Sequence, residues 1–309
     1  MNSTPETLVH KKKNKAFLIF ILPGTILYTI FVIIPIICST YFSFFEWSGI
    51  GPMSFVGLHN FDYLLFGERM SPIFVNALKV TFKYLLAVLV IITPVQIFFA
   101  YILYLKIRFS KYIRIMLFLP YVLSISIVGF FSLLVFDGNI GLLNTAITKL
   151  FGAEYTVAWI GDPKWMFRVF VCMIIWQCIG SGMMIFYADM QSISNDIIEA
   201  SIVDGCGDVR RFFSIILPNM RASLSSNTVL SVIYALTMFG LPYVVFGPSG
   251  GIDNAMDFVA MVFYRYAFGG TYYGTTDIGF GSSISVVLLV IIVICYLITN
   301  RFVKKLRDE

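Results

Sequence analysis

Long apolar stretches alternate with short polar segments along the whole chain. Six stretches of 20 to 25 residues contain no Asp, Glu, Lys, Arg or His. A helix of about 20 apolar residues crosses the roughly 30 Å hydrocarbon core of a bilayer, and it pairs all of its own backbone groups there. The pattern therefore predicts an all-α integral membrane protein with six transmembrane helices, at residues 16–40, 84–105, 115–136, 169–188, 222–246 and 278–300.

The lysine and arginine residues lie mostly on one side of the predicted helices. Fifteen of them fall in the amino-terminal tail, the second-to-third connection, the fourth-to-fifth connection and the carboxy-terminal tail, in groups of four, four, three and four. The other side holds only Arg69, Lys149, Lys164 and Arg265, with three more basic residues at helix mouths. By the positive-inside rule both termini are expected in the cytoplasm of a multi-pass protein of the cell membrane.

The same pattern divides the chain into segments. We expect a basic cytoplasmic tail at 1–15, a first helix with an outer loop at 16–74, a five-helix domain at 75–300 and a short cytoplasmic tail at 301–309. The first apolar stretch could instead be a signal peptide, but it is too long and no small-x-small cleavage site closes it.

Two local features modify this picture. The apolar, aromatic stretch around 258–268 in the last outer loop predicts an interfacial helix at the outer surface. Prolines within the spans predict local kinks that neighbouring helices accommodate, with gating hinges as the alternative. These prolines are Pro23, Pro35, Pro94, Pro120 and Pro242.

Composition narrows the class of protein. Hydrophobic residues make up 59% of the 309 residues and charged residues 13%, whereas soluble domains are about 45–50% apolar and about 25% charged. Too few charges remain to cover a water-exposed surface, which argues against a soluble enzyme or a disordered regulator. The five cysteines form no CxxC pair and resemble small buried hydrophobes rather than a disulfide or metal framework.

The spans also lack the groups that chemistry requires. A proton-coupled carrier needs an ionisable residue in the membrane, and a membrane hydrolase needs a nucleophile with a base or a metal ligand set. The only histidines, His10 and His59, lie outside the spans, and no G-x-x-x-x-G-K-[ST] phosphate loop occurs. We therefore expect no catalytic residue, no metal site and no cofactor in this chain.

The longest inward connection, 189–221, has a pattern of its own. Asn195 or Asp196 can cap a short helix, Gly205 and Gly207 break it, and a second amphipathic piece runs to Pro218. A short helix-turn-helix without a core of its own suggests a plug for a groove in another protein. An ordinary amphipathic helix at the membrane surface is the alternative.

This connection resembles the signature of the permeases of binding-protein-dependent ABC importers. That signature reads Glu-Ala-Ala-x-x-Asp-Gly-Ala, five residues, then Phe-x-x-Ile-x-Leu-Pro, and Ser201 and Cys206 replace two of its alanines here. The resemblance implies a type I ABC importer permease fold whose cytoplasmic coupling helix docks on a separate ABC ATPase dimer, where ATP and Mg²⁺ bind. The coupling residues so implied are Glu199, Ala200, Ser201, Asp204, Gly205, Phe212, Leu217 and Pro218.

Other segments resemble the sugar-importer permeases similar to the maltose system. They are 43–47, 55–61, Trp176, 188–191 and 264–268. The resemblance implies a second homologous permease, an extracellular or periplasmic solute-binding protein, membrane lipid around the helices and a carbohydrate substrate. Nucleic acid is not among the expected partners.

A sugar site needs uncharged hydrogen-bonding groups and aromatic surfaces at mid-membrane depth. The fourth and fifth spans supply such side chains, and by resemblance these two spans form much of the cavity wall. Each of them could instead bond or pack between helices. The substrate candidates are Trp176, Gln177, Ser181, Tyr234, Thr237 and Met238, and Ser231 and Asn227 lie one and two turns inward of Tyr234 on the fifth span.

Other functions remain open at this point. An importer of the same class could carry a glycerol phosphate ester or a polyamine, although the charge-free spans favour a neutral solute. A secondary carrier would need ionisable residues in the membrane, and a structural scaffold leaves the coupling signature unexplained.

Overall fold

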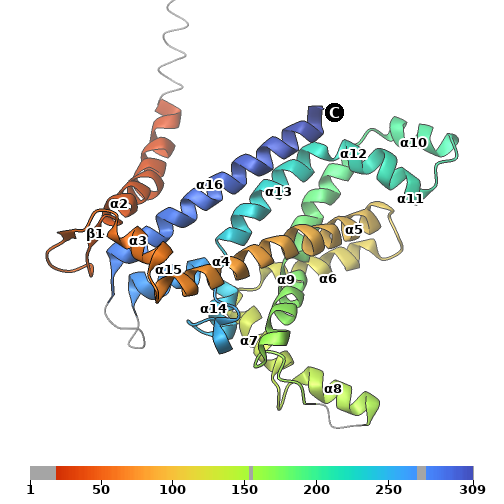
Figure 1. Cartoon of the computed structure of the whole chain (residues 1–309). Coiled ribbons are helices and arrows are strands. Elements are labelled where there is room, and N and C mark those ends of the chain that lie inside the picture. Colours follow the sequence, from red (N-terminus) through yellow and green to blue (C-terminus); the bar gives the residue numbers. More distant parts are fainter. Residues whose placement is uncertain (1–18, 153–155, 270–275, 309) are drawn as a thin grey trace, which may run out of the picture.

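The computed structural model describes residues 19–152, 156–269 and 276–308, and these are mostly helical (Figure 1). The expected tail 1–15 and residues 16–18 of the first expected span lie outside the described residues. The elements are η1 (Thr29–Ile33), α2 (Ile34–Phe42), β1 (Phe45–Glu46), β2 (Ser54–Phe55), α3 (His59–Phe66), α4 (Met70–Ala87), η2 (Val88–Ile92), α5 (Thr93–Tyr104), α6 (Ser110–Val122), α7 (Ile125–Phe136), α8 (Leu142–Phe151), α9 (Pro163–Gln191), α10 (Asn195–Val203), α11 (Asp208–Arg211), η3 (Phe212–Ile216), α12 (Leu217–Asn219), α13 (Arg221–Leu236), α14 (Gly240–Phe246), η4 (Ile252–Asn254), α15 (Val259–Phe268) and α16 (Ile278–Asp308).

Five described helices are long and apolar enough to cross a membrane. The number of candidate spans rises to six if the bent pair α6 and α7 counts as one span. Five of the six expected spans are therefore present, four of them as continuous helices and the fifth as α13 and α14 with a break at 237–239. The second is longer than expected, because the helix continues through the charged residues Lys79 and Lys83. The five are Ile19–Phe42, Met70–Tyr104, Pro163–Gln191, Arg221–Phe246 and Ile278–Arg301.

The third expected span, 115–136, differs from a straight helix. Its two halves, α6 and α7, meet at an angle of 103°. Leu123 and Ser124 between them have extended backbones, and the Ser124 hydroxyl accepts a hydrogen bond from the Ile127 N–H at 3.3 Å. A serine in this position caps a new helix and so ends the previous one. The absence of charge indicated an apolar segment, but it carried no information on this break.

Three wide π-turns occur in the described residues, two within long helices and one between α11 and α12, and each ends two residues before a proline. These turns are η1 before Pro35, η2 before Pro94 and η3 before Pro218. Proline has no N–H and its ring presses on the preceding turn. A single π-turn lets the helix widen and continue. The distortions expected at Pro35 and Pro94 take this form.

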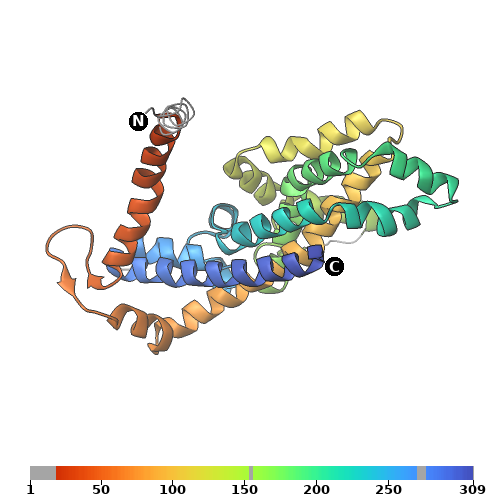
Figure 2. The same cartoon turned by 90° about the horizontal axis from the view of Figure 1, so that it is seen from above.

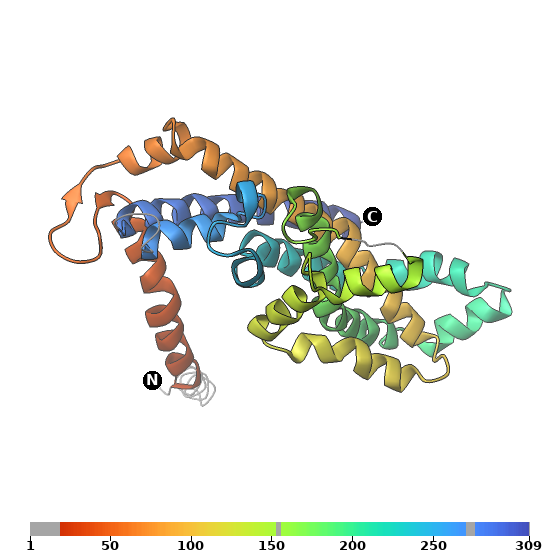
Figure 3. The same ribbon diagram turned by 90° about the horizontal axis from the view of Figure 1, so that it is seen from below.

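The first helix stands apart from the others (Figures 2 and 3). None of its most apolar 18-residue window is buried. It touches the rest of the chain where α2 meets α16, and the hydroxyls of Ser39 and Ser285 lie 2.8 Å apart there. Its apolar surface is therefore open to lipid or to another membrane subunit.

The remaining helices enclose three groups of buried apolar side chains. The largest lies between α4, α9, α13 and α14, where the rings of Tyr84, Phe170 and Phe258 meet at centroid distances of 5.3 to 5.7 Å. The second joins α3, α4, α15 and α16, and the third joins α5, α9 and the segment before α13. The helix expected around 258–268 is α15, and its buried residues Val259 and Val262 face α4 and α16.

Glycines allow α9 to approach α6 and α5 closely. A Cβ atom at Gly180 would lie 2.6 Å from the Leu117 carbonyl oxygen and from the Phe118 Cα atom. A Cβ atom at Gly182 would collide with the Gln96 side chain. Small residues bring helix backbones together in membranes in this way.

We expect Gly180→Val to destabilise the fold, because the backbone of α6 cannot move aside as a side chain can. Overpacking of this kind costs about 1–3 kcal/mol. Thermal unfolding in detergent, followed by loss of the monodisperse peak, measures the effect. Gly24→Val is the matched control, since nothing lies within 4 Å of a Cβ atom there. An equal loss for both variants would contradict the close approach of α6 and α9.

Candidate functional site

The connection between α9 and α13 forms the expected helix-turn-helix, far from α2 along the molecule (Figure 1). The cap of α10 is Ser194, whose hydroxyl accepts a hydrogen bond from the Asp196 N–H at 3.2 Å. Neither Asn195 nor Asp196 is the cap, because both already have helical positions. Ser194 has the extended backbone that a cap requires.

The turn between α10 and α11 requires a glycine. Gly205 has a φ of +72°, a left-handed conformation that other residues rarely adopt. The Gly205 N–H donates to the Ile202 carbonyl at 3.0 Å, and the Cys206 N–H donates to the Ser201 carbonyl at 2.9 Å. This pair of bonds is a Schellman motif, which ends a helix sharply. The two short helices therefore have a defined relative orientation.

The predicted coupling residues have two kinds of environment. Ser201 is buried, and the half-buried side chains of Phe212 and Leu217 line an apolar pocket against α5. Glu199, Ala200, Asp204 and Gly205 are exposed, while Pro218 is half-buried in α12. Several large apolar side chains beside them are exposed as well, namely Ile197, Ile202, Val203, Val209 and Phe213.

A cavity of about 370 Å³ lies between α4, α5, α6, α9 and α13. Its described lining contains no Asp, Glu, Lys, Arg or His. The Oη atom of Tyr84 and the Nδ2 atom of Asn227 are buried without a hydrogen-bond partner in the described part of the chain. The polar or thiol side chains of the lining are Tyr84, Gln96, Tyr121, Cys178, Ser181, Asn227, Ser231 and Tyr234.

The structure places two of the six substrate candidates, Ser181 and Tyr234, in this cavity. Gln177 is buried but is not part of the lining. Trp176 lines a separate apolar groove of about 440 Å³ between α7 and α9. Five residues along a helix turn the side chain by about 140°, so Trp176 and Ser181 do not share a face.

The other two candidates lie beyond the end of α13 at Leu236. The Thr237 hydroxyl donates to the Ile233 carbonyl at 2.9 Å, and Met238 is buried in the largest apolar core. Neither side chain is part of the cavity lining.

Ser231 and Asn227, which the sequence places one and two turns inward of Tyr234, also lie in the lining. Tyr84, Gln96 and Tyr121 complete the polar lining, and they were not among the candidates. Asn227, Ser231 and Tyr234 follow one another at spacings of four and three residues, which places them on one face of a helix.

An assembly of apolar helices around a cavity lined without charged side chains, with a short helical projection at one end, is typical of a membrane transport subunit. The chain belongs to the family described as binding-protein-dependent transport system inner membrane component, which matches residues 92–308. It is a multi-pass permease of an ABC importer and has the type I fold.

Similar proteins agree with this assignment. The probable ABC transporter permease protein YurN of Bacillus subtilis is 29% identical over 303 residues, covering 96% of this chain and 99% of that protein. The arabinooligosaccharides transport system permease protein AraP of the same organism is 27% identical over 306 residues, covering 98% and 92%. The diacetylchitobiose uptake system permease protein NgcF of Streptomyces coelicolor is 29% identical over 305 residues, covering 92% and 82%.

A solved structure shares the fold. It is a chain of the bacterial alginate ABC transporter in complex with an alginate pentasaccharide-bound periplasmic protein. The two chains align with a TM-score of 0.81 at 20% identity, over 95% of this chain and 96% of that one. At this identity the likeness concerns the fold alone.

Proposed function

We propose that this chain is one of two homologous permease subunits of an ATP-driven importer for a neutral sugar or oligosaccharide. A solute-binding protein outside the membrane delivers the sugar, and the cavity beside Tyr84 and Asn227 lies on its path inward. Both termini face the cytoplasm in this proposal. The names of the relatives that take up diacetylchitobiose and arabinooligosaccharides support a saccharide substrate.

The observation that carries the proposal is the pair of unpartnered polar atoms at the cavity, Tyr84 Oη and Asn227 Nδ2. A buried polar atom without a partner costs free energy. Tyr84 is fully buried in this state, so in our proposal the lining opens as the sugar enters and a sugar hydroxyl then supplies that partner. An anionic or cationic solute would need a counter-charge, and the described lining has none. The cavity chemistry therefore supports a neutral, hydroxyl-rich solute.

The energy source in this proposal is a separate ATPase dimer that holds ATP and Mg²⁺. The connection 189–221 docks on it through the residues from Glu199 to Pro218. The exposed apolar side chains of Ile202, Val203 and Phe213 support such a docking surface, because water is a poor environment for them. ATP binding shifts the permease between inward-facing and outward-facing states by the difference in docking free energy between those states.

We expect Tyr84→Phe and Asn227→Ala each to lower sugar uptake about fivefold to tenfold, the value of one hydrogen bond of about 1–1.5 kcal/mol. The assay uses ¹⁴C-labelled cellobiose, maltotriose, arabinotriose and diacetylchitobiose, with labelled digalacturonic acid as the charged probe. Cells carry the variant in place of the native gene, together with the partner subunits. The sugar that wild-type cells import fastest serves for the comparison.

Thr237→Val is the control for these variants, because the Thr237 hydroxyl bonds to the Ile233 carbonyl in the last turn of α13 and lies outside the cavity lining. If Tyr84 and Asn227 were only packing residues, removing their unpartnered atoms would stabilise the chain and leave uptake unchanged. That outcome, or faster import of digalacturonic acid than of any neutral sugar, would contradict the proposal.

A further inference from the structure

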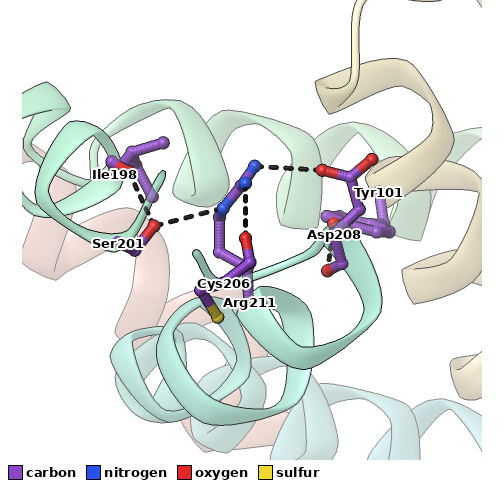
Figure 4. Close-up of polar contacts among 6 residues, drawn as sticks. All are labelled: Tyr101, Ile198, Ser201, Cys206, Asp208 and Arg211. Atoms are coloured by element: carbon purple, nitrogen blue, oxygen red, sulfur yellow. Dashed lines mark hydrogen bonds and ion pairs between the residues drawn. The ribbon is translucent and has the colours of Figure 1, made fainter. Parts of the chain in front are cut away.

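One arginine holds the two short helices of the 189–221 connection together (Figure 4). The Arg211 Nε atom donates to the Ser201 hydroxyl at 3.2 Å, and Nη2 donates to the Cys206 carbonyl at 2.9 Å. Its Nη1 atom donates to the Asp208 carboxylate at 3.1 Å. A single planar guanidinium thus bonds to α10, to the turn and to α11. The side chain is only 12% exposed.

The geometry of these contacts suits arginine in particular. The three acceptors lie around one guanidinium, whose nitrogens point in fixed directions. A lysine ammonium is a point charge on a flexible stem and does not reproduce this fork. The Ser201 hydroxyl donates its own proton to the Ile198 carbonyl at 2.6 Å, so its oxygen is free to accept from Arg211.

A second contact joins this clamped unit to the helix that lines the cavity. The Tyr101 hydroxyl, on α5, donates to the Asp208 backbone carbonyl at 2.7 Å. The Tyr101 ring also lies against the Phe212 ring at a centroid distance of 4.6 Å. Tyr101 is therefore attached to α11 and η3 at two points.

The same helix reaches the cavity within five residues. Gln96 lies on α5 and lines the cavity, and its Nε2 atom donates to the Cys178 carbonyl of α9 at 2.7 Å. A displacement of the clamped unit would move α5 at Tyr101, and α5 carries Gln96 at the cavity wall. The structure therefore contains a continuous chain of contacts from the exposed loop to the cavity.

We propose that Arg211 and Tyr101 are positioning residues that couple ATP hydrolysis to sugar movement, and this rests on the proposed function. Arg211 makes the loop move as one body, and Tyr101 passes that movement to α5. Neither side chain touches the sugar or ATP. Without these contacts the ATPase would still dock and hydrolyse ATP, but part of its cycle would leave the cavity unmoved.

The test is the number of sugar molecules imported for each ATP hydrolysed. Complete importers that contain Arg211→Lys or Tyr101→Phe are reconstituted in liposomes. The transported solute is whichever of the four ¹⁴C-labelled neutral sugars named above the wild type imports fastest. Arg211→Lys keeps the charge but loses the fork, and Tyr101→Phe keeps the ring contact with Phe212 but loses the hydroxyl. Tyr104→Phe is the matched control, since Tyr104 stacks on Tyr101 and, in the described chain, makes no hydrogen bond to the loop.

We expect both variants to lower the sugar-to-ATP ratio about threefold, while Tyr104→Phe keeps the wild-type ratio. The sugar-to-ATP ratio of the double variant should fall no further than that of the worse single variant, because both residues belong to the same chain of contacts between the loop and α5. A role confined to stability would reduce the amount of assembled importer and leave the ratio unchanged, which would overturn the inference. Wild-type importers that show no ATP-driven uptake would overturn the proposed function itself, and the inference with it.

Discussion

Replacing Gly205 by leucine is expected to reduce sugar uptake at least tenfold while the chain still inserts and assembles in the membrane. Gly205 has a φ of +72°, and leucine in this left-handed conformation costs about 1–2 kcal/mol. The turn relieves this strain by opening, which breaks the Schellman bonds of Ser201 and Ile202. The loop then presents altered geometry to the ATPase.

Gly152, at the end of α8 and outside the 189–221 connection, provides a control for this variant. Gly152 ends α8 with a φ of +69°, and no atom lies within 4 Å of a Cβ atom at either glycine. Gly152→Leu therefore introduces the same backbone strain and the same side chain away from the loop. We expect Gly152→Leu to import sugar at close to the wild-type rate. Normal uptake by Gly205→Leu, or equal losses in both variants, would contradict the coupling role of the turn.

Replacing Arg265 by methionine is expected to cause the largest loss of stability, about 3–5 kcal/mol. The guanidinium donates to the two Asp257 carboxylate oxygens at 3.1 and 2.6 Å and to the Pro248 carbonyl at 2.6 Å. The side chains are 6% and 0% exposed, so the variant leaves a carboxylate buried without its counter-charge. Denaturant titration of the purified chain in detergent micelles measures the change in the free energy of unfolding.

The loss of stability in Arg265→Met should become larger as the pH rises. Burial raises the pKa of the Asp257 carboxyl, and the Arg265 guanidinium opposes that shift. In Arg265→Met only the raising effect of burial remains, so the folded state favours the protonated carboxyl. A pKa that is higher in the folded state gives stability at low pH, and this is lost as the pH rises. We therefore expect Arg265→Met to be more stable at pH 5 than at pH 8.

Two controls separate the ion pair from charge in general. Lys164→Met removes an exposed positive charge and should leave stability unchanged within about 0.5 kcal/mol. Adding Asp257→Ala to Arg265→Met removes both partners and should recover part of the loss. A double variant no more stable than Arg265→Met at neutral pH would show that the buried charge is not the cause.

The membrane-spanning segments could be predicted well from the sequence because a bilayer excludes charge along a whole helix. The same rule could not find the bend between α6 and α7, since Leu123 and Ser124 are uncharged and only the serine cap ends the helix. Helical spacing, a separate argument, put Thr237 and Met238 among the candidates with Tyr234, although α13 ends at Leu236 and neither residue lines the cavity.

The candidate site could be predicted in part. Ser181 and Tyr234 lie at the cavity, but Tyr84 and Gln96 belong to a span where either face could have met another helix. Only packing decides which polar side chain is left without a partner. In the amphipathic piece that ends at Pro218, helical spacing places Arg211 opposite the apolar residues. Its bonds to Ser201 and Cys206 depend on the folded turn, which spacing alone does not reveal.

The most direct test of the central claim is uptake by liposomes that contain the complete importer, with and without ATP and Mg²⁺ on the cytoplasmic side. The binding protein outside is loaded with whichever of the four ¹⁴C-labelled neutral sugars the wild type imports fastest. The account predicts that label accumulates inside only with ATP, and that ionophores which collapse ion gradients do not reduce it. Accumulation without ATP that is lost when an ionophore is added would contradict it.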